Sequence, residues 1–169
     1  MAAIADKSKP YLPLANLIGD GWSKEGEAIA TCFCGIVQLA SISQGLINTF
    51  ICNCVDCQKI TASMFASNFT VDDKYLKHLR SRDNLKTFSQ SHTIASGNNM
   101  TNYFCSTCGT PMYRVSTGYP RMSILRIGTI DDLVLHETKL RPQIEQFTND
   151  RVNWLPGVEG TKKFVGIHT

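Results

Sequence analysis

Charged residues, histidines and long apolar runs are all scarce in this sequence. Asp, Glu, Lys and Arg make up 18% of its 169 residues, and the formal net charge is +3 at pH 7. The densest basic stretch, residues 77–86, also holds Asp83, which is typical of a solvated face. The pair Lys162-Lys163 is too short to serve as a basic tail for DNA or RNA. We therefore expect no nucleic-acid partner.

No apolar run is long enough for a signal peptide or a membrane span. Residues 1–20 hold only short apolar pieces, and Pro10 and Pro13 interrupt them. We expect a cytoplasmic, reducing environment and no membrane partner. In such an environment, clustered cysteines are metal ligands or catalytic thiols more often than disulfides.

The remaining composition is that of an ordinary globular protein. Hydrophobic residues amount to 43%, and the length is that of one domain. Residues 1–26 are punctuated by Pro and Gly and show little periodicity, so we expect an irregular N-terminal arm there. Residues 27–169 are expected to form a single domain.

Short strands dominate the predicted secondary structure. A helical turn is predicted over 56–61, and an amphipathic helix over 72–79 with Asp72 as its cap. The segment 96–99 (SGNN) predicts a turn before the strand 100–105, which leads into the last cysteine cluster. The seven predicted strands, rich in β-branched and aromatic residues, cover 36–42, 46–52, 64–71, 85–89, 100–105, 112–115 and 122–127. The expected fold class is mainly antiparallel β.

The sequence does contain seven cysteines, and they fall into three clusters. An odd number cannot pair completely into disulfides, and the spacings are those of metal-binding knuckles. Gly35 follows the first cluster and Gly109 follows the last, so each has a residue that relieves the backbone of a tight turn. The clusters are Cys32-x-Cys34, Cys52-x-Cys54-x-x-Cys57 and Cys105-x-x-Cys108.

Seven cysteines divide most economically into four and three. A closed structural zinc site takes four protein ligands, whereas a catalytic zinc site keeps three and leaves the fourth position open. Spacing alone does not fix which clusters combine. The economical division predicts a structural zinc that stabilises the fold and a second, open zinc. Their respective ligands would be Cys32, Cys34, Cys105 and Cys108, and Cys52, Cys54 and Cys57.

The three-cysteine site carries the functional interpretation. Zinc with three thiolates is a poor Lewis acid for water, but a thiol at the open position would still be deprotonated. A thiolate is a strong nucleophile towards a carbonyl carbon. The alternative is that a fourth side chain closes this site and makes it structural. The candidates for that ligand are His78, His92, His136 and Asp56.

Three segments resemble the glutathione-dependent formaldehyde-activating family, which also contains centromere-protein-V-like proteins. The segments are CFCG (32–35), CNCVDCQK (52–59) and FCSTCGTPMY (104–113). The order and the spacing of the cysteines both agree with the family pattern, and weaker similarity follows in 127–132 and 141–155.

The resemblance implies a fold of small antiparallel sheets, the β-tent, stapled by zinc. It also implies the division given above, with four structural and three catalytic zinc ligands. The implied reaction joins formaldehyde to glutathione, which is formally a carbon–sulfur lyase running in reverse. Glutathione would then complete the coordination of the catalytic zinc.

Several positions depart from the common family pattern. Many relatives have His where this chain has Asn53, and Gly-Ser where it has Ala62-Ser63. The segment 110–113 (TPMY) is more similar to the broad branch that is common in fungi than to the founding enzymes. A family can retain its fold and metal sites while its substrate pocket changes. The carbonyl partner is therefore expected to be either formaldehyde or a larger compound.

The leading hypothesis is therefore a zinc-dependent carbon–sulfur lyase. Its substrates would be adducts of glutathione, or of another small thiol, with formaldehyde or a larger carbonyl compound, in detoxification or secondary metabolism. Lys59, Arg114 and Trp154 are candidate substrate-binding residues. Two alternatives stay open: a zinc tailoring enzyme that does not use glutathione, and a non-catalytic zinc-binding module.

Overall fold

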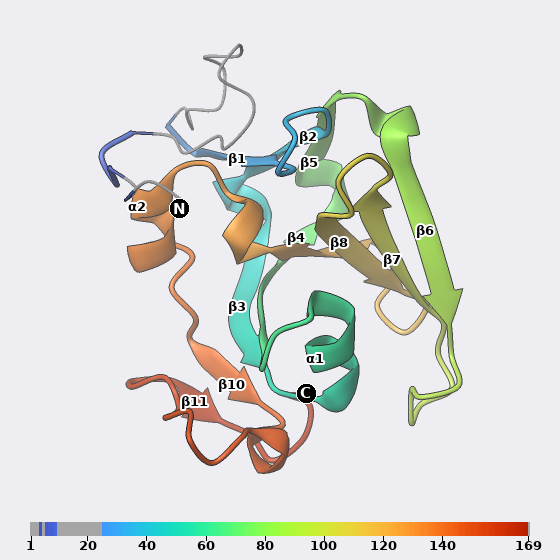
Figure 1. Cartoon of the computed structure of the whole chain (residues 1–169), viewed down its shortest axis with the longest axis vertical. Helices are drawn as coiled ribbons and strands as arrows, with labels where there is room; N and C mark the ends of the chain where they lie inside the picture. The colour runs from blue at the N-terminus through green and yellow to red at the C-terminus, as the bar shows by residue number, and fades with distance from the viewer. Residues whose placement is uncertain (1–3, 5, 10–24, 169) are drawn as a thin grey trace.

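Two β-sheets form the framework of the computed structural model, which describes residues 4, 6–9 and 25–168. The smaller sheet has the strand order β1-β2-β5, and the larger has the order β11-β10-β3-β4-β9-β8-β7-β6. In Figure 1 the smaller sheet lies at the upper end of the molecule, and β10 and β11 lie at the lower end. The strands are β1 (Glu27–Thr31), β2 (Gln38–Ile42), β3 (Leu46–Cys52), β4 (Ala66–Asp72), β5 (Leu76–Arg80), β6 (Leu85–Gln90), β7 (Met100–Cys105), β8 (Pro111–Ser116), β9 (Met122–Arg126), β10 (Ile144–Gln146) and β11 (Lys162–Lys163).

Short helices and 3-10 turns connect these strands. α1 (Val55–Thr61) follows β3 almost directly and is capped by Ala62, whose positive φ of 50° turns the chain back towards β4. α2 (Leu133–Glu137) begins after Asp132, whose side chain accepts a hydrogen bond from the backbone of its first turn. The 3-10 turns are η1 (Ser43–Gly45), η2 (Asp73–Tyr75), η3 (Arg82–Asn84), η4 (Ile127–Thr129) and η5 (Thr148–Asp150).

The prediction of a mainly β fold is confirmed. Each of the seven predicted strands is present, with bounds within two residues of those expected, and the helical turn predicted over 56–61 is α1. The turn predicted at 96–99 belongs to a longer loop between β6 and β7, where Gly97 has a positive φ of 70°. As expected, β7 then leads directly to Cys105.

The helix predicted over 72–79 is wrong. Only η2 is helical there. Asp72 does cap it, by accepting a backbone N–H at 3.1 Å, but the following residues form β5. Along β5 every second residue, including Lys77 and Leu79, is exposed. This period of two matches a strand, and antiparallel pairing with β2 outweighs the local helical pattern.

The sheets are mainly antiparallel, as expected, with two short parallel pairs at one edge of the larger sheet. β10 pairs in parallel with β3, and β11 pairs in parallel with β10. In this register Gln146 lies opposite Cys52, where β3 ends. β10 has three residues and β11 has two, too few for an alternating pattern to reveal them. The pairing brings the C-terminal part of the chain to the central cysteines.

The main hydrophobic core contains side chains of both sheets. Leu39 of β2 packs in one cluster with Phe69, Met112 and Leu125 of the larger sheet, and all four are at most 1% exposed. Complete burial of a side chain of this size contributes about 1.5–3 kcal/mol. The smaller sheet is therefore held against the larger by apolar packing.

A second, smaller cluster surrounds the central cysteines. Cys52 and Cys57 pack there with Phe50, Ile124 and Ile144. These neighbours belong to β3, β9 and β10, so three strands of the larger sheet fix the position of the two thiols.

Only part of the predicted N-terminal arm can be compared with the structure, because residues 1–3, 5 and 10–24 lie outside the described residues. Among the arm residues that are described, Lys7 pairs with Glu137 at the end of α2, with 2.6 Å between nitrogen and oxygen. Across the described parts of the chain, no helix has the length and apolar character needed to cross a membrane.

Gly45 provides a test of how η1 and η2 pack. A Cβ atom at this position would lie 2.5 Å from both Cβ and Cδ2 of Tyr75. We expect Gly45→Ala to lower the free energy of unfolding by about 1–3 kcal/mol, because the ring cannot withdraw without moving its own backbone. Denaturant unfolding would measure the change. The matched control is Gly166→Ala, where an added Cβ meets nothing within 4 Å; equal stability of the two variants would contradict this packing argument.

Candidate metal centres

Four sulfurs from distant parts of the chain converge in one cluster. The Cys32–Cys34 and Cys34–Cys105 sulfur distances are 3.5 Å and 3.8 Å. Tetrahedral zinc with Zn–S bonds of about 2.3 Å requires sulfurs about 3.8 Å apart. These thiols therefore fit a closed zinc site. The four members, whose sulfurs all lie within 4.8 Å of one another, are Cys32, Cys34, Cys105 and Cys108.

Tight backbone turns point both sulfurs of each pair towards the cluster. The Gly35 N–H donates to the Cys32 carbonyl at 2.8 Å, and the Gly109 N–H donates to the Cys105 carbonyl at 2.8 Å. Both glycines have positive φ, 81° and 74°, a conformation that a side chain would strain. The glycines after the two pairs thus have the role predicted from the sequence.

Thr110 links the two turns to each other. Its hydroxyl oxygen accepts a hydrogen bond from the Phe33 N–H at 3.1 Å and lies 3.1 Å from the Cys108 sulfur. Burial raises the pKa of Cys108, but hydrogen bonds from Thr110 and Cys34 outweigh burial and lower it to about 6. A thiolate is therefore available at this cluster at neutral pH.

The remaining three cysteines form a separate cluster at the C-terminal end of β3. The sulfurs of Cys52, Cys54 and Cys57 lie within 4.8 Å of one another, and the Cys52–Cys54 distance is 3.4 Å. Cys54 is also the N-cap of α1, because its sulfur accepts the Cys57 N–H at 3.4 Å. Cys52 and Cys57 are buried, whereas Cys54 is partly exposed. A ligand would therefore approach on the Cys54 side.

No fourth ligand of the kinds considered from the sequence completes this cluster. Among the described residues, the three sulfurs are joined by no His, Asp or Glu ligand atom within 4.8 Å. His78 instead packs edge-on against Tyr113, and Asp56 accepts a hydrogen bond from Thr93. The candidates that lie outside the cluster are His78, His92, His136 and Asp56.

Asn53 anchors the three-cysteine cluster to β10. It is 1% exposed, and its side-chain amide donates to Glu145 Oε1 at 3.2 Å and to the Gln146 carbonyl at 3.1 Å. Glu145 also accepts a hydrogen bond from Arg151 at 2.7 Å, so its buried charge is paired. Asn53 thus serves as an amide clamp between the cluster and β10.

Two arginines from neighbouring strands face the three-cysteine cluster. Arg114 of β8 donates from Nη1 to the Cys57 sulfur at 3.4 Å. Arg126 of β9 is 5% exposed, donates to Asn68 at 2.6 Å and interacts electrostatically with Cys57. Sequence analysis identified Arg114 but missed Arg126. The available signal was an arginine inside the apolar run of residues 124–127 (ILRI).

This environment lowers the pKa of Cys57. Hydrogen bonds from the Cys52 and Cys54 thiols are the main cause, and the charges of Arg114 and Arg126 add to it, so that together they outweigh burial. The shared hydrogen bonds raise the pKa of Cys52 in turn. Burial and then repulsion from Arg114 lower the pKa of Arg126 to about 10, so this guanidinium stays charged at neutral pH. One thiolate is therefore favoured at Cys57 before any metal binds.

A cavity of about 260 Å³ is lined by neighbours of both clusters. Arg126 and Ala66 are among them, and Ala66 is the β4 residue paired with Cys52. Thr110, which contacts the four-cysteine cluster, lines it as well. The cavity therefore adjoins the side chains that support both clusters.

The three substrate-binding candidates are not brought together. Arg114 contacts the three-cysteine cluster, whereas Lys59 on α1 is exposed and Trp154 is 71% exposed. Neither Lys59 nor Trp154 is among the described residues that line the cavity.

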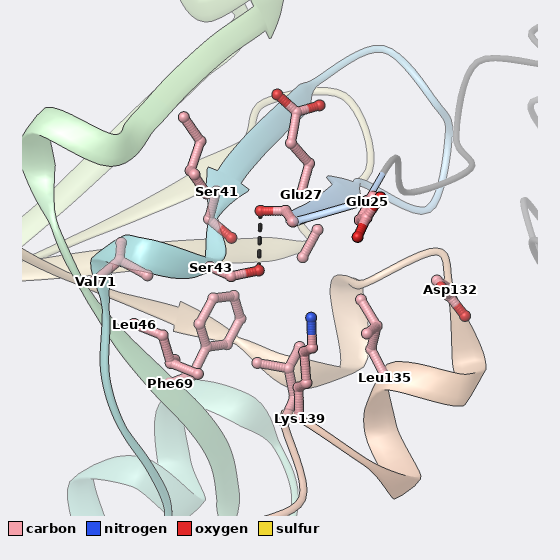
Figure 2. Close-up of a pocket in the computed structure, with 14 residues that line it drawn as sticks. Glu25, Glu27, Ser41, Ser43, Leu46, Phe69, Val71, Asp132, Leu135 and Lys139 are labelled. Carbon is pink, nitrogen blue, oxygen red and sulfur yellow. Dashed lines mark hydrogen bonds between the residues drawn. The ribbon is translucent and has the colours of Figure 1, made fainter.

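A different cavity, of about 220 Å³, lies below the smaller sheet. Figure 2 shows Leu46 and Phe69 on one side of it and Leu135 on the other, with Lys139 between them. The Ser43 hydroxyl donates to the Gly26 carbonyl at 2.9 Å at its edge. None of the described residues that line this cavity is a cysteine, so it is separate from both candidate metal sites.

The model of the family described as glutathione-dependent formaldehyde-activating enzyme matches residues 27–150. The chain belongs to this family. The matched span holds all seven cysteines and both arginines of the three-cysteine cluster. Donor sets made only of thiolates favour zinc over harder ions such as Mg²⁺ or Ca²⁺, so both clusters of this family member can hold zinc.

Other comparisons add little to this assignment. No curated protein matches the sequence. Among solved structures, the crystal structure of a Rhodobacter sphaeroides protein is similar at 21% sequence identity, over 60% of this chain and 85% of that chain, with a TM-score of 0.48.

The two clusters should respond differently to loss of one sulfur. Cys105→Ser should lower the melting temperature and the solubility, because Cys105 is fully buried and ties two distant turns together. Cys54→Ser should leave the fold largely intact, because serine is itself a favourable N-cap for α1. Circular dichroism and zinc analysis would measure both effects. If both variants unfold alike, the division into a structural and an open site is wrong.

Proposed function

We propose that this protein is a zinc-dependent carbon–sulfur lyase-type enzyme. It would form and cleave adducts of glutathione, or of another small thiol, with formaldehyde or a larger carbonyl compound. The observation that carries the proposal is a cluster of three cysteine sulfurs that no His, Asp or Glu of the described residues completes. Membership of the formaldehyde-activating family supports the same chemistry.

Cys52, Cys54 and Cys57 would hold the catalytic zinc, and the other four cysteines would hold a structural zinc. When bound at three thiolates with an open position, zinc lowers the pKa of an incoming thiol. Arg114 holds the Cys57 sulfur by a hydrogen bond, and Asn53 fixes the loop between the first two sulfurs to β10. The chain therefore supplies a rigid frame with one partly exposed side, at Cys54.

The bond changes of the proposed reaction are simple. The thiolate sulfur adds to the carbonyl carbon, a C–S bond forms, and the π electrons of the C=O bond move to the oxygen. That oxygen takes a proton from water and becomes the hydroxyl of the adduct, while the proton that the thiol lost on becoming a thiolate neutralises the hydroxide left behind. Cleavage runs through the same changes in reverse, and no oxidant or reductant is needed.

Cobalt substitution would test whether the site accepts a thiol. In Co²⁺-loaded protein, glutathione should increase the sulfur-to-cobalt charge-transfer absorption until one equivalent is bound. If neither glutathione nor another small thiol changes the spectrum, the proposed function is wrong. A zinc tailoring enzyme that works without thiols would then be the better candidate.

Catalysis is tested separately with zinc-loaded protein. Nuclear magnetic resonance with ¹³C-formaldehyde and glutathione should show adduct exchange faster than the spontaneous rate. Cys54→Ser should return exchange to the spontaneous rate while its circular dichroism spectrum stays unchanged. The matched control is Val55→Ser at the next position, which is 56% exposed and should keep the accelerated rate. A Cys54→Ser protein as fast as wild type would contradict the assignment of this cluster, and a larger aldehyde tested in parallel would reveal the preferred carbonyl partner.

A further inference from the structure

The two cysteine clusters differ in the groups that surround their sulfurs. At the four-cysteine cluster the sulfur contacts are with neutral donors: the Val37 N–H at 3.2 Å from Cys32 and the Asn84 amide at 3.3 Å from Cys105. At the three-cysteine cluster the neighbours include two guanidinium groups. Arg80 also lies beside the four-cysteine cluster, where it donates to the Gly35 and Ile36 carbonyls. The three-cysteine cluster thus has more guanidinium groups beside it and fewer thiolates.

These guanidinium groups are buried and are positioned by the larger sheet. Arg126 is 5% exposed and is fixed by its bond to Asn68, the residue opposite it in the β4–β9 pairing. Arg114 is only partly buried as a residue, but its Nε atom is buried. The Nε atoms of Arg114 and Arg126 are both buried without a hydrogen-bond partner among the described residues. Buried donors of this kind are costly unless a ligand or water satisfies them.

The two arginines change the net charge of the zinc-loaded three-cysteine site. A divalent ion with three thiolates carries one negative charge, and two guanidinium groups more than offset it. The loaded site would therefore hold one positive charge in excess, in a buried setting where charges interact strongly. Buried Glu145 does not cancel this excess, because it is already paired with Arg151.

We propose that Arg114 and Arg126 are positioning residues that make the three-cysteine site select an anionic fourth ligand over a neutral one. This inference rests on the proposed function for its zinc site and deepens it, because a thiolate is such a ligand and a neutral amine or imidazole is not. Arg114 acts through its bond to Cys57. Arg126 also lines the cavity of about 260 Å³, so it is the member of the pair that a ligand in that cavity meets.

Small probe ligands would test the selection in Co²⁺-loaded protein. Azide is a monoanion and imidazole is neutral, and the d–d spectrum of cobalt reports the binding of each. Arg114→Gln and Arg126→Gln should each weaken azide binding on the order of tenfold, because each removes one positive charge beside the ligand. Imidazole binding should change by less than about twofold, since a neutral ligand gains little from the lost charge. Arg126→Lys keeps the charge and should retain most of the azide affinity.

The control variant is Arg121→Gln, which removes an arginine from an exposed turn between β8 and β9 and should bind both probes as the wild type does. Cobalt stoichiometry and melting temperature identify variants that have lost the site itself. If a Gln variant loses cobalt, Arg114→Lys and Arg126→Lys are tested in its place. A folded Lys variant that no longer prefers azide to imidazole would count against the proposal.

The outcomes separate this inference from the proposed function. Unchanged azide affinity in the Gln variants, or an equal loss of azide and imidazole, overturns the inference even if glutathione adducts are formed. Azide preference that depends on the arginines, without any catalysis of adduct formation, supports the inference and overturns the proposed function.

Discussion

The convergence of thiol sulfurs is the constraint on which the rest of this structure depends. Sulfurs that repel one another as thiolates are held within 4.8 Å in two places, and ligation by a metal turns that repulsion into attraction. One cluster joins Cys34 to Cys105, 71 residues apart. The turn with positive φ at Gly35 and the bridge made by Thr110 serve this convergence. The apolar core between the two sheets packs next to this crossing.

The two clusters share one ligand chemistry but differ in the number of sulfurs and in their surroundings. The four-cysteine cluster is saturated by its own sulfurs and sits where two turns meet, so stabilisation of the fold is the role it fits. The three-cysteine cluster sits on the larger sheet, with Cys54 partly exposed and a cavity nearby. Its cationic neighbours are absent from the described sulfur contacts of the other cluster. The cluster with fewer sulfurs is therefore the one whose sulfurs have arginine neighbours.

Local features were predictable from the sequence, whereas features that depend on tertiary contacts were not. The cysteine spacings and the glycines beside them identified both clusters, and short runs rich in β-branched and aromatic residues identified seven strands. β10 and Arg126 were missed for related reasons: β10 is too short to show a period, and an arginine in an apolar run has no distinctive meaning until Asn68 is seen opposite it. The helix predicted over 72–79 failed because pairing with β2 decides the conformation of that segment.

The order in which the chain leaves the ribosome has a consequence for metal loading. The first cysteine pair emerges long before its partners, since Cys34 must wait 71 residues for Cys105. The central cluster is complete after Cys57, but its clamp to Glu145 spans 92 residues. During translation, the four-cysteine centre therefore cannot close before Cys105 and Cys108 emerge, whereas all three sulfurs of the central cluster are present once Cys57 has emerged. The four-cysteine centre is accordingly the later of the two to acquire its full set of ligands in biosynthesis.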